Sequence, residues 1–204
     1  MWIKICGLTT PEAVSAALAA GVDAVGFVFA QSSRRVTPEF AAWLATPARG
    51  RARRVAVVRH PVQAEIDEML RVFSPDVLQG DWAELAGLRL PVALERLPVV
   101  RAVSAAPAAL PARILFEGAV SGAGITADWD AARMLAQRTQ LVLAGGLDSG
   151  NIGAAVAAVC PFGVDVSSGV EERPGSKSPA EIMRFVLAAR AAFGARAYRK
   201  EDRR

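Results

Sequence analysis

Residues 141–178 read LVLAGGLDSGNIGAAVAAVCPFGVDVSSGVEERPGSKS. The stretch contains two short apolar runs, 141–146 and 164–169, and each ends in glycine or serine. Between them lies an alanine-rich segment, 151–159, with the composition of a helix. Short, nearly continuous apolar runs are typical of parallel strands that helices cover on both faces. The stretch therefore predicts a strand, a helix and a second, parallel strand.

The same alternation extends back to the N-terminus. Six more β-prone runs lie at 2–7, 23–29, 53–59, 76–80, 92–97 and 113–118. Helical patterns lie at 11–21, 38–48, 63–73, 82–88, 105–110, 129–138, 151–159 and 179–193. Three helix starts are marked by a hydroxyl residue before proline, at Thr10, Thr37 and Ser178, because such a residue caps the helix and proline suits its first turn. The chain thus predicts eight strand–helix units.

Eight such units in order form either a closed barrel or a doubly wound sheet. The ends of the predicted strands favour the barrel, because residues suited to chemistry recur there from the first strand to the last. They are Cys6, Gln79, Glu117, Gly145–Gly146 and Ser167–Ser168. A doubly wound sheet gathers its site at one switch point, whereas a barrel builds it from many strand ends. We predict a single (β/α)₈ TIM barrel over residues 1–195, with short fourth and fifth helices. A basic C-terminal tail, 196–204, follows, and the chain is expected to fray after Phe193.

The composition narrows the classes of function. Hydrophobic residues make up 52% of the 204 residues and the formal net charge is +4. The basic residues are not interleaved with aromatics, so we expect no nucleic-acid partner, while an anionic small molecule fits the charge. No apolar run approaches the roughly 18 residues of a membrane span, and the N-terminus lacks the plan of a signal peptide. With only two cysteines and no disulfide framework, we expect a cytoplasmic protein.

The glycine and serine turns of the opening stretch predict a phosphate site. Gly145 and Gly146 end the seventh strand, and Ser167, Ser168 and Gly169 end the eighth. Glycine lets backbone N–H groups approach a phosphate closely, and serine hydroxyls add donors. A single Gly-Gly pair is more often a plain turn. Both turns together, on the two strands where barrels commonly hold a phosphate, favour the ligand role.

Cys6, at the end of the first strand, is the candidate reactive group. Its thiolate could accept a proton or act as a nucleophile, and a buried structural cysteine is the alternative. A phosphate site nearby and the charge of Lys4 or Arg34 would favour the thiolate. The only histidine, His60, follows the third strand and fits a loop residue better than a partner of Cys6.

Two carboxylates and an arginine pair complete the candidate site. Glu117 ends the apolar sixth strand, where burial would suit it to donate a proton; a salt bridge to Arg34 or Arg96 is the alternative. Asp165 on the eighth strand is the second candidate carboxylate. Arg34 and Arg35 could bind a carboxylate or phosphate through a bidentate fork, or simply form a solvated loop.

Four motifs together resemble the phosphoribosylanthranilate isomerase family. They are KICGLTTPEAVSAALAAGVDAVGFVF at 4–29, SRRVTP at 33–38, LAGGLDSGNI at 143–152 and VDVSSGVEERPGSKS at 164–178. The resemblance covers nearly the whole chain. It implies an Amadori rearrangement in tryptophan biosynthesis that converts N-(5-phosphoribosyl)anthranilate into its 1-deoxyribulose isomer without cofactor or metal. The expected partner is thus a sugar-phosphate substrate, and the assembly is either a monomer or a homodimer.

The resemblance also implies roles for individual residues. Cys6 matches the general base, and Glu117 stands where the family has its general acid, usually an aspartate. Arg34 matches the arginine at the anthranilate end, and Asp165 matches a substrate-contacting aspartate. The residues that match the phosphate cradle are Gly145, Gly146, Ser167, Ser168 and Gly169.

The chain departs from the family pattern around the acid and the anthranilate end. Glu117 is one methylene longer than the usual acid, a change that can misplace a proton by about an ångström. Residues 79–81 read Gln-Gly-Asp where the family has Gln-Leu-His-Gly; the loop at 119–124 differs, and the run before Arg34 is one residue shorter. Two alternatives stay open: a barrel that binds a phosphometabolite without turnover, and an isomerase of a related aminoaldose carrying two phosphates. The latter would need a second glycine-rich cradle, and strands two to four offer none.

Overall fold

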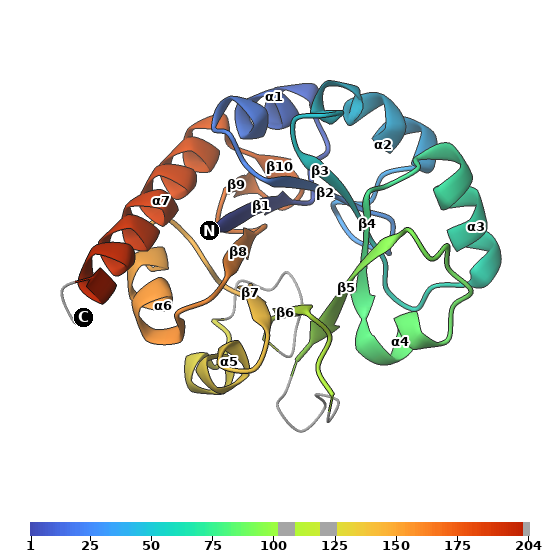
Figure 1. The fold of residues 1–204 in the computed structure, drawn as a ribbon. Coiled ribbons are helices and arrows are strands. Elements are labelled where there is room, and N and C mark those ends of the chain that lie inside the picture. The colour runs from blue at the N-terminus through green and yellow to red at the C-terminus, as the bar shows by residue number, and fades with distance from the viewer. Residues whose placement is uncertain (102–108, 119–125, 202–204) are drawn as a thin grey trace.

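Eight parallel strands close into a barrel with helices around its outside (Figure 1). The computed structural model describes residues 1–101, 109–118 and 126–201. The strands pair in chain order, and the last closes on the first. They are β1 (Trp2–Cys6), β2 (Ala24–Val28), β3 (Arg53–Val57), β4 (Val77–Asp81), β5 (Glu95–Val100), β6 (Arg113–Phe116), β7 (Gln140–Leu143) and β8 (Gly163–Val166). The predicted TIM barrel is confirmed.

The helices fall where the alanine-rich patterns predicted them. They are α1 (Pro11–Ala19), α2 (Pro38–Leu44), α3 (Gln63–Val72), α4 (Trp82–Ala86), α5 (Trp129–Ala136), α6 (Ile152–Val159) and α7 (Pro179–Glu201). The hydroxyls of Thr10, Thr37 and Ser178 accept the expected capping hydrogen bonds. A short 3₁₀ turn, η1 (Thr46–Ala48), interrupts the predicted second helix, because Pro47 has no N–H to continue it. The helix predicted at 105–110 falls largely outside the described residues.

Alternation along the strands decides which side chains face the barrel interior. On β1, Ile3 and Ile5 pack outward against the helices, whereas Trp2 belongs to a separate apolar cluster inside the barrel. Valines, leucines and alanines from β2 to β7 fill that inner cluster together with Trp2. This apolar cluster fills the lower part of the barrel interior. The polar side chains that point inward lie above it, at the carboxyl ends of the strands.

Two segments differ from the sequence prediction. The fifth strand is β5 (Glu95–Val100) rather than 92–97, because the sequence pattern breaks at Pro98 while the strand continues through it. The backbone after Phe193 is helical to Glu201 rather than frayed, since alanines favour a helix and basic residues suit its C-terminal end. Residues 196–201 of the predicted tail therefore belong to the last turns of α7.

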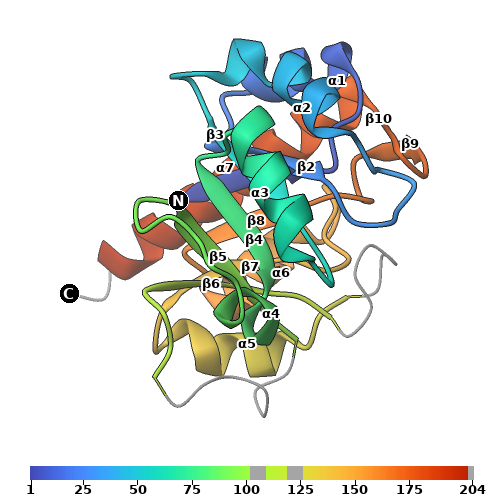
Figure 2. The same ribbon diagram turned by 90° about the vertical axis from the view of Figure 1, so that its right-hand side faces the viewer.

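A two-stranded hairpin, β9 (Glu171–Arg173) and β10 (Ser176–Lys177), follows β8 beyond the end of the barrel (Figure 2). Gly175 at its tip packs so closely that an added Cβ would lie 2.5 Å from the carbonyl oxygen of Ser33. The Thr9 hydroxyl also donates to the carbonyl of Gly175. The hairpin is thus fixed to the loops that follow β1 and β2. None of the helices in the described ranges is long and apolar enough to cross a membrane.

Candidate active site

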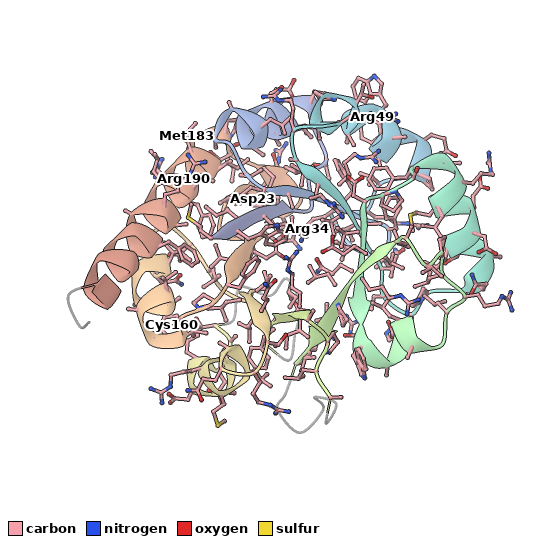
Figure 3. All side chains as sticks on the ribbon, in the orientation of Figure 1. Asp23, Arg34, Arg49, Cys160, Met183 and Arg190 are labelled. Carbon is pink, nitrogen blue, oxygen red and sulfur yellow. The ribbon has the colours of Figure 1, made fainter. Side chains whose placement is uncertain are left out.

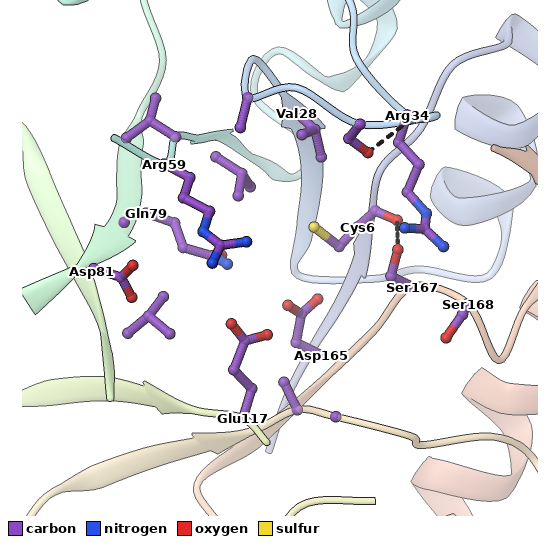
Figure 4. A pocket seen from close by; sticks show the side chains of 18 of the residues that line it. Cys6, Val28, Arg34, Arg59, Gln79, Asp81, Glu117, Asp165, Ser167 and Ser168 are labelled. Carbon is purple, nitrogen blue, oxygen red and sulfur yellow. Dashed lines mark hydrogen bonds between the residues drawn. The ribbon is translucent and has the colours of Figure 1, made fainter. Parts of the chain in front are cut away.

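A cleft opens at the carboxyl ends of the strands, and most of the predicted site residues line it (Figure 4). The predicted residues that line it are Cys6, Arg34, Glu117, Gly145, Gly146, Asp165, Ser167 and Ser168. They converge because each stands at an inward position at a strand end or in the loop beyond it, as expected for barrel enzymes.

Cys6 lies in the cleft directly above a buried ion pair. The Lys4 ammonium is fully buried and lies 2.9 Å from Oδ2 of Asp165 on the neighbouring strand β8. On the other side, Gly26 of β2 leaves room for both β1 side chains. A Cβ there would lie 2.9 Å from Cε of Lys4 and 3.0 Å from Sγ of Cys6. The ion pair with Asp165 therefore keeps the Lys4 ammonium group below the thiol. Packing against Gly26 limits where the Cys6 side chain can lie.

Burial raises the pKa of the Cys6 thiol, and the nearby charge of Lys4 only partly opposes this effect. The expectation that the charge of Lys4 makes the thiolate the favoured form is therefore wrong. The physical reason is that removing a thiolate from water costs more than one ammonium group returns. A base at Cys6 must be ionised before it acts, and Lys4 lowers the cost of that step.

The pH dependence of Cys6 alkylation tests this assignment. Iodoacetamide reacts with the thiolate, so its rate should rise about tenfold per pH unit while the thiol dominates. Since the pKa of Cys6 lies above its ordinary value of 9.0, we expect the rise to continue past pH 9. Peptide mass spectrometry separates Cys6 from the exposed Cys160. A Cys6 rate that levels off below pH 9 would contradict the assignment.

Glu117 at the end of β6 is held by an arginine that the sequence analysis missed. Nη2 of Arg101 lies 2.7 Å from Oε1 of Glu117, and its Nη1 pairs with Asp81 of β4. The salt-bridge alternative for Glu117 thus applies, but with Arg101 rather than Arg34 or Arg96. The sequence pattern does not point to Arg101, because the predicted fifth strand, 92–97, ends before it. With β5 at Glu95–Val100, the inward alternation of Leu97 and Val99 continues to Arg101.

Arg34 is fixed by the hairpin that follows β8. Its Nε and Nη2 donate to the two carboxylate oxygens of Glu171 at 2.7 and 2.8 Å. Glu171 also accepts a 2.7 Å hydrogen bond from the buried Lys177, which in turn donates to the carbonyl and hydroxyl of Ser167. The Ser167 hydroxyl donates to the backbone carbonyl of Cys6. This network ties the hairpin to the strand end that carries the thiol.

The phosphate cradle has unequal parts. Gly145 and Gly146 both have positive φ, of 86° and 61°, and neither amide donates to an acceptor in the described ranges. Two such amides in a turn form an anion-binding concavity. The Ser168 hydroxyl makes no hydrogen bond with any residue that the structure describes, whereas that of Ser167 is already engaged. Gly169 does not line the cleft, and a Cβ there would lie 1.9 Å from the Leu147 carbonyl oxygen, so it holds the two turns together.

Two buried oxygens in the cleft wall lack a hydrogen-bond partner within the described part of the chain. They are Oε1 of Gln79 and Oδ1 of Asp165. Buried polar atoms are normally satisfied, so an unpaired one that faces a cleft points to a ligand group. Both are acceptors and suit the hydroxyl groups of a sugar.

The remaining predictions fall outside the cleft or outside the described residues. Nδ1 of His60 contacts Glu84 at 2.6 Å and the histidine side chain is 76% exposed, so it is a loop residue as expected. The Arg35 guanidinium group donates to Gln31 at 3.4 Å, its backbone N–H donates to Ser32, and the exposed residue belongs to the loop after β2. The loop at 119–124 lies outside the described residues. Among those described, no group of His, Cys, Asp and Glu is placed to hold a metal ion.

Fold and cleft together define a class: a (β/α)₈ barrel with a phosphate turn on its last two strands and ionisable groups facing each other across its mouth. The family model described as N-(5'phosphoribosyl)anthranilate (PRA) isomerase matches residues 3–188. The chain belongs to this family.

Individual relatives agree with the family match. The N-(5'-phosphoribosyl)anthranilate isomerase of Rhizobium etli is 40% identical over 202 residues, which cover 90% of this chain and 91% of the relative. The crystal structure of the Thermus thermophilus enzyme superposes with a TM-score of 0.81 at 29% identity, covering 94% and 99% of the two chains. A third structure, a phosphoribosylanthranilate isomerase bound to reduced 1-(o-carboxyphenylamino)-1-deoxyribulose 5-phosphate, is 27% identical with a TM-score of 0.76, again covering 94% and 99%.

Proposed function

We propose that this chain isomerises N-(5-phosphoribosyl)anthranilate to 1-(2-carboxyphenylamino)-1-deoxyribulose 5-phosphate in tryptophan biosynthesis. The observation that carries the proposal is the placing of Cys6 and Glu117 in one cleft with the phosphate turns. A relative of the same family binds a reduced analogue of this product.

The phosphate cradle orients the sugar. The amides of Gly145 and Gly146, with the hydroxyl of Ser168, bind the 5-phosphate at one end of the cleft. Oε1 of Gln79 and Oδ1 of Asp165 accept hydrogen bonds from ribose hydroxyls. Fixing one end of the substrate brings its C1 and C2 atoms between the two catalytic side chains.

Glu117 and Cys6 then act as acid and base in turn. A protonated Glu117 gives its proton to the furanose ring oxygen; the bond from that oxygen to C1 breaks, and the nitrogen lone pair forms the C1=N iminium. The Cys6 thiolate removes the C2 proton, and the C–H electron pair forms a C1=C2 enolamine. The enolamine then becomes the C2 ketone by moving its hydroxyl proton to C1.

Complementation tests the function in a cell. A bacterial strain that lacks its own isomerase requires tryptophan, and expression of this chain should restore growth without it. Expression of the Cys6→Ala variant, at a matched level of folded protein, should not. No growth with abundant folded wild-type protein would contradict the proposal.

Replacement of Glu117 separates acid catalysis from an ion pair. Glu117→Gln keeps the shape and a hydrogen-bond acceptor for Arg101 but has no proton to donate. We expect kcat/KM to fall about 10²- to 10⁴-fold, the usual contribution of a general acid. Glu117→Asp keeps the carboxyl group and introduces the aspartate that the resemblance implies for the acid, so its kcat/KM should stay within about tenfold of wild type. Equal losses in the two variants would show that position rather than proton donation matters.

One observation favours a second candidate function. Arg101 holds Glu117 and Asp81 in ion pairs, which is also how a purely structural carboxylate would be held. A barrel of that kind would bind the phosphate ligand but turn it over weakly. Weak wild-type turnover that Glu117→Gln does not lower further, or complementation that fails despite tight ligand binding, would favour this second candidate.

We also propose that the chain works in the cytoplasm, as a monomer or a homodimer. Cys6 and Cys160 are both free thiols, which fits a reducing compartment.

A further inference from the structure

The altered motif at 79–81, Gln-Gly-Asp, contains a carboxylate for which the mechanism above has no use. Counted along β4 from Gln79, Asp81 stands two positions further on, where the resemblance implies a histidine. Residues two apart on a strand share a face, and both Gln79 and Asp81 line the cleft. The chain therefore has a carboxylate at a point of the cleft wall where the family pattern has an imidazole group.

The side chain of Asp81 does not make the contact that is usual for an aspartate at its position. Asp81 is the residue that precedes α4, and an aspartate there normally accepts a hydrogen bond from a backbone N–H of the first helical turn. The Asp81 side chain makes no such bond. Its carboxyl group lies at the edge of the cleft (Figure 4), where it pairs with Nη1 of Arg101. Asp81 therefore contacts the cleft rather than the start of α4.

Arg101 joins Asp81 to the candidate acid. It follows β5, which lies between β4 and β6 in the barrel. Its Nη1 pairs with Asp81 on the β4 side, and its Nη2 donates to Oε1 of Glu117 at 2.7 Å on the β6 side. The three side chains are only 14% to 23% exposed, so water screens their charges less than it screens surface pairs. A change at Asp81 can therefore reach Glu117 through one guanidinium group.

The candidate acid needs this contact because it is a glutamate. Its side chain has one more rotatable bond than the aspartate that the resemblance implies, so its carboxyl group has more positions open to it. Burial raises the pKa of Asp165, Lys4 opposes the rise, and the charge of Glu117 adds to it, so the two carboxyl groups interact across the cleft. Figure 4 shows Glu117 between Asp81 and Asp165. Arg101 is the contact that holds Glu117 away from Asp165.

We propose that Asp81 is a positioning residue for acid catalysis: it holds Arg101, and Arg101 holds the carboxyl group of Glu117 where its proton reaches the furanose ring oxygen. The inference rests on the proposed function and gives the altered motif on β4 a role in it. Asp81 acts through Arg101 and transfers no proton itself. The longer acid and the carboxylate at position 81 are thus the two ends of one ion-pair bridge.

Steady-state kinetics of Asp81 variants test this role. Asp81→Ala should lower kcat for phosphoribosylanthranilate about 10- to 100-fold, because a misplacement of about one ångström costs up to about 100-fold. The KM should change less than about threefold, since the phosphate turns are untouched. Asp81→Asn keeps an acceptor oxygen for Arg101 and should recover part of the loss.

A double variant separates positioning of the acid from any other effect of Asp81. Glu117→Gln leaves no acid to position, so adding Asp81→Ala to it should lower the rate less than about twofold further. Single turnovers with excess enzyme measure this rate above the spontaneous reaction.

Asp76→Ala is the matched control. Asp76 precedes the same strand at its other end and binds Arg54 through both carboxylate oxygens, but it does not line the cleft. Its kcat should stay within about twofold of wild type, and urea unfolding checks that both variants are folded. Equal kcat values for Asp81→Ala and Asp76→Ala, or a further loss of about tenfold or more in the double variant, would overturn the inference while wild-type turnover leaves the proposed function standing. A folded wild-type protein that turns over no substrate would instead overturn the proposed function, and this inference with it.

Discussion

Replacing Cys6 with alanine should lower kcat/KM for phosphoribosylanthranilate by about 10²- to 10⁴-fold, toward the spontaneous rate. The thiol at the end of β1 is the candidate base, and the Lys4–Asp165 pair lies below it. Cys6→Ser should be as inactive as Cys6→Ala, because a hydroxyl group ionises far less readily than a thiol. A stopped assay that follows substrate fluorescence measures the loss, and chemical unfolding checks that the variant is folded.

The second cysteine provides the control for this experiment. Cys160 follows α6 at the outer surface of the barrel, away from the centre (Figure 3). Cys160→Ser should keep kcat/KM within about twofold of wild type. A Cys6→Ala enzyme that is as active as Cys160→Ser would show that another group removes the C2 proton.

Replacing Lys4 with methionine should cause the largest loss of stability. Lys4 is completely buried and its only carboxylate partner in the described residues is Asp165, 2.9 Å away. Burial lowers the pKa of Lys4, but the contacts with Asp165 and Cys6 more than offset it and keep the group charged. Removing one partner of a buried pair leaves an uncompensated charge, which costs about 3–5 kcal/mol of unfolding free energy.

Urea titration of the single and double variants measures this cost. Lys4→Met combined with Asp165→Leu removes both charges, so we expect the double variant to recover much of the stability that Lys4→Met loses. The difference in unfolding free energy between the single and the double variant measures the cost of the unpaired Asp165 carboxylate. It does not measure the loss of the lysine stem, which methionine replaces in both variants. Loss of less than about 1 kcal/mol in Lys4→Met would show that water or rearrangement compensates the charge.

Most of the fold was predictable because the eight units repeat one simple pattern. Apolar runs bounded by glycine or serine, followed by alanine-rich helices with Thr-Pro or Ser-Pro starts, gave both the barrel and its helix positions. The exceptions lie at prolines. Pro98 disguised the true extent of β5, and Pro47 ended α2 early.

The candidate site was predictable where one residue at a strand end suffices. Cys6, Glu117 and the glycine turns could be placed from the alternation alone, since inward strand ends meet at one face of a barrel. Their partners could not, because ion pairs join residues far apart in sequence. Arg101 depended on the exact end of β5, and nothing local pairs Arg34 with Glu171, 137 residues away.

The chemical state of the thiol also depended on the three-dimensional structure. Because Lys4 lies only two positions before Cys6 in the sequence, its positive charge was expected to favour the thiolate. The depth of burial, which the sequence does not give, reverses the direction of the pKa shift.

Direct turnover by the pure protein tests the central claim most plainly. Freshly prepared phosphoribosylanthranilate is mixed with the purified chain, and the loss of its fluorescence is followed against a blank and the Cys6→Ala variant. The structure predicts rapid loss with wild type and a near-blank rate with the variant. A rate no faster than the spontaneous one, from a folded wild-type sample, would contradict the isomerase assignment.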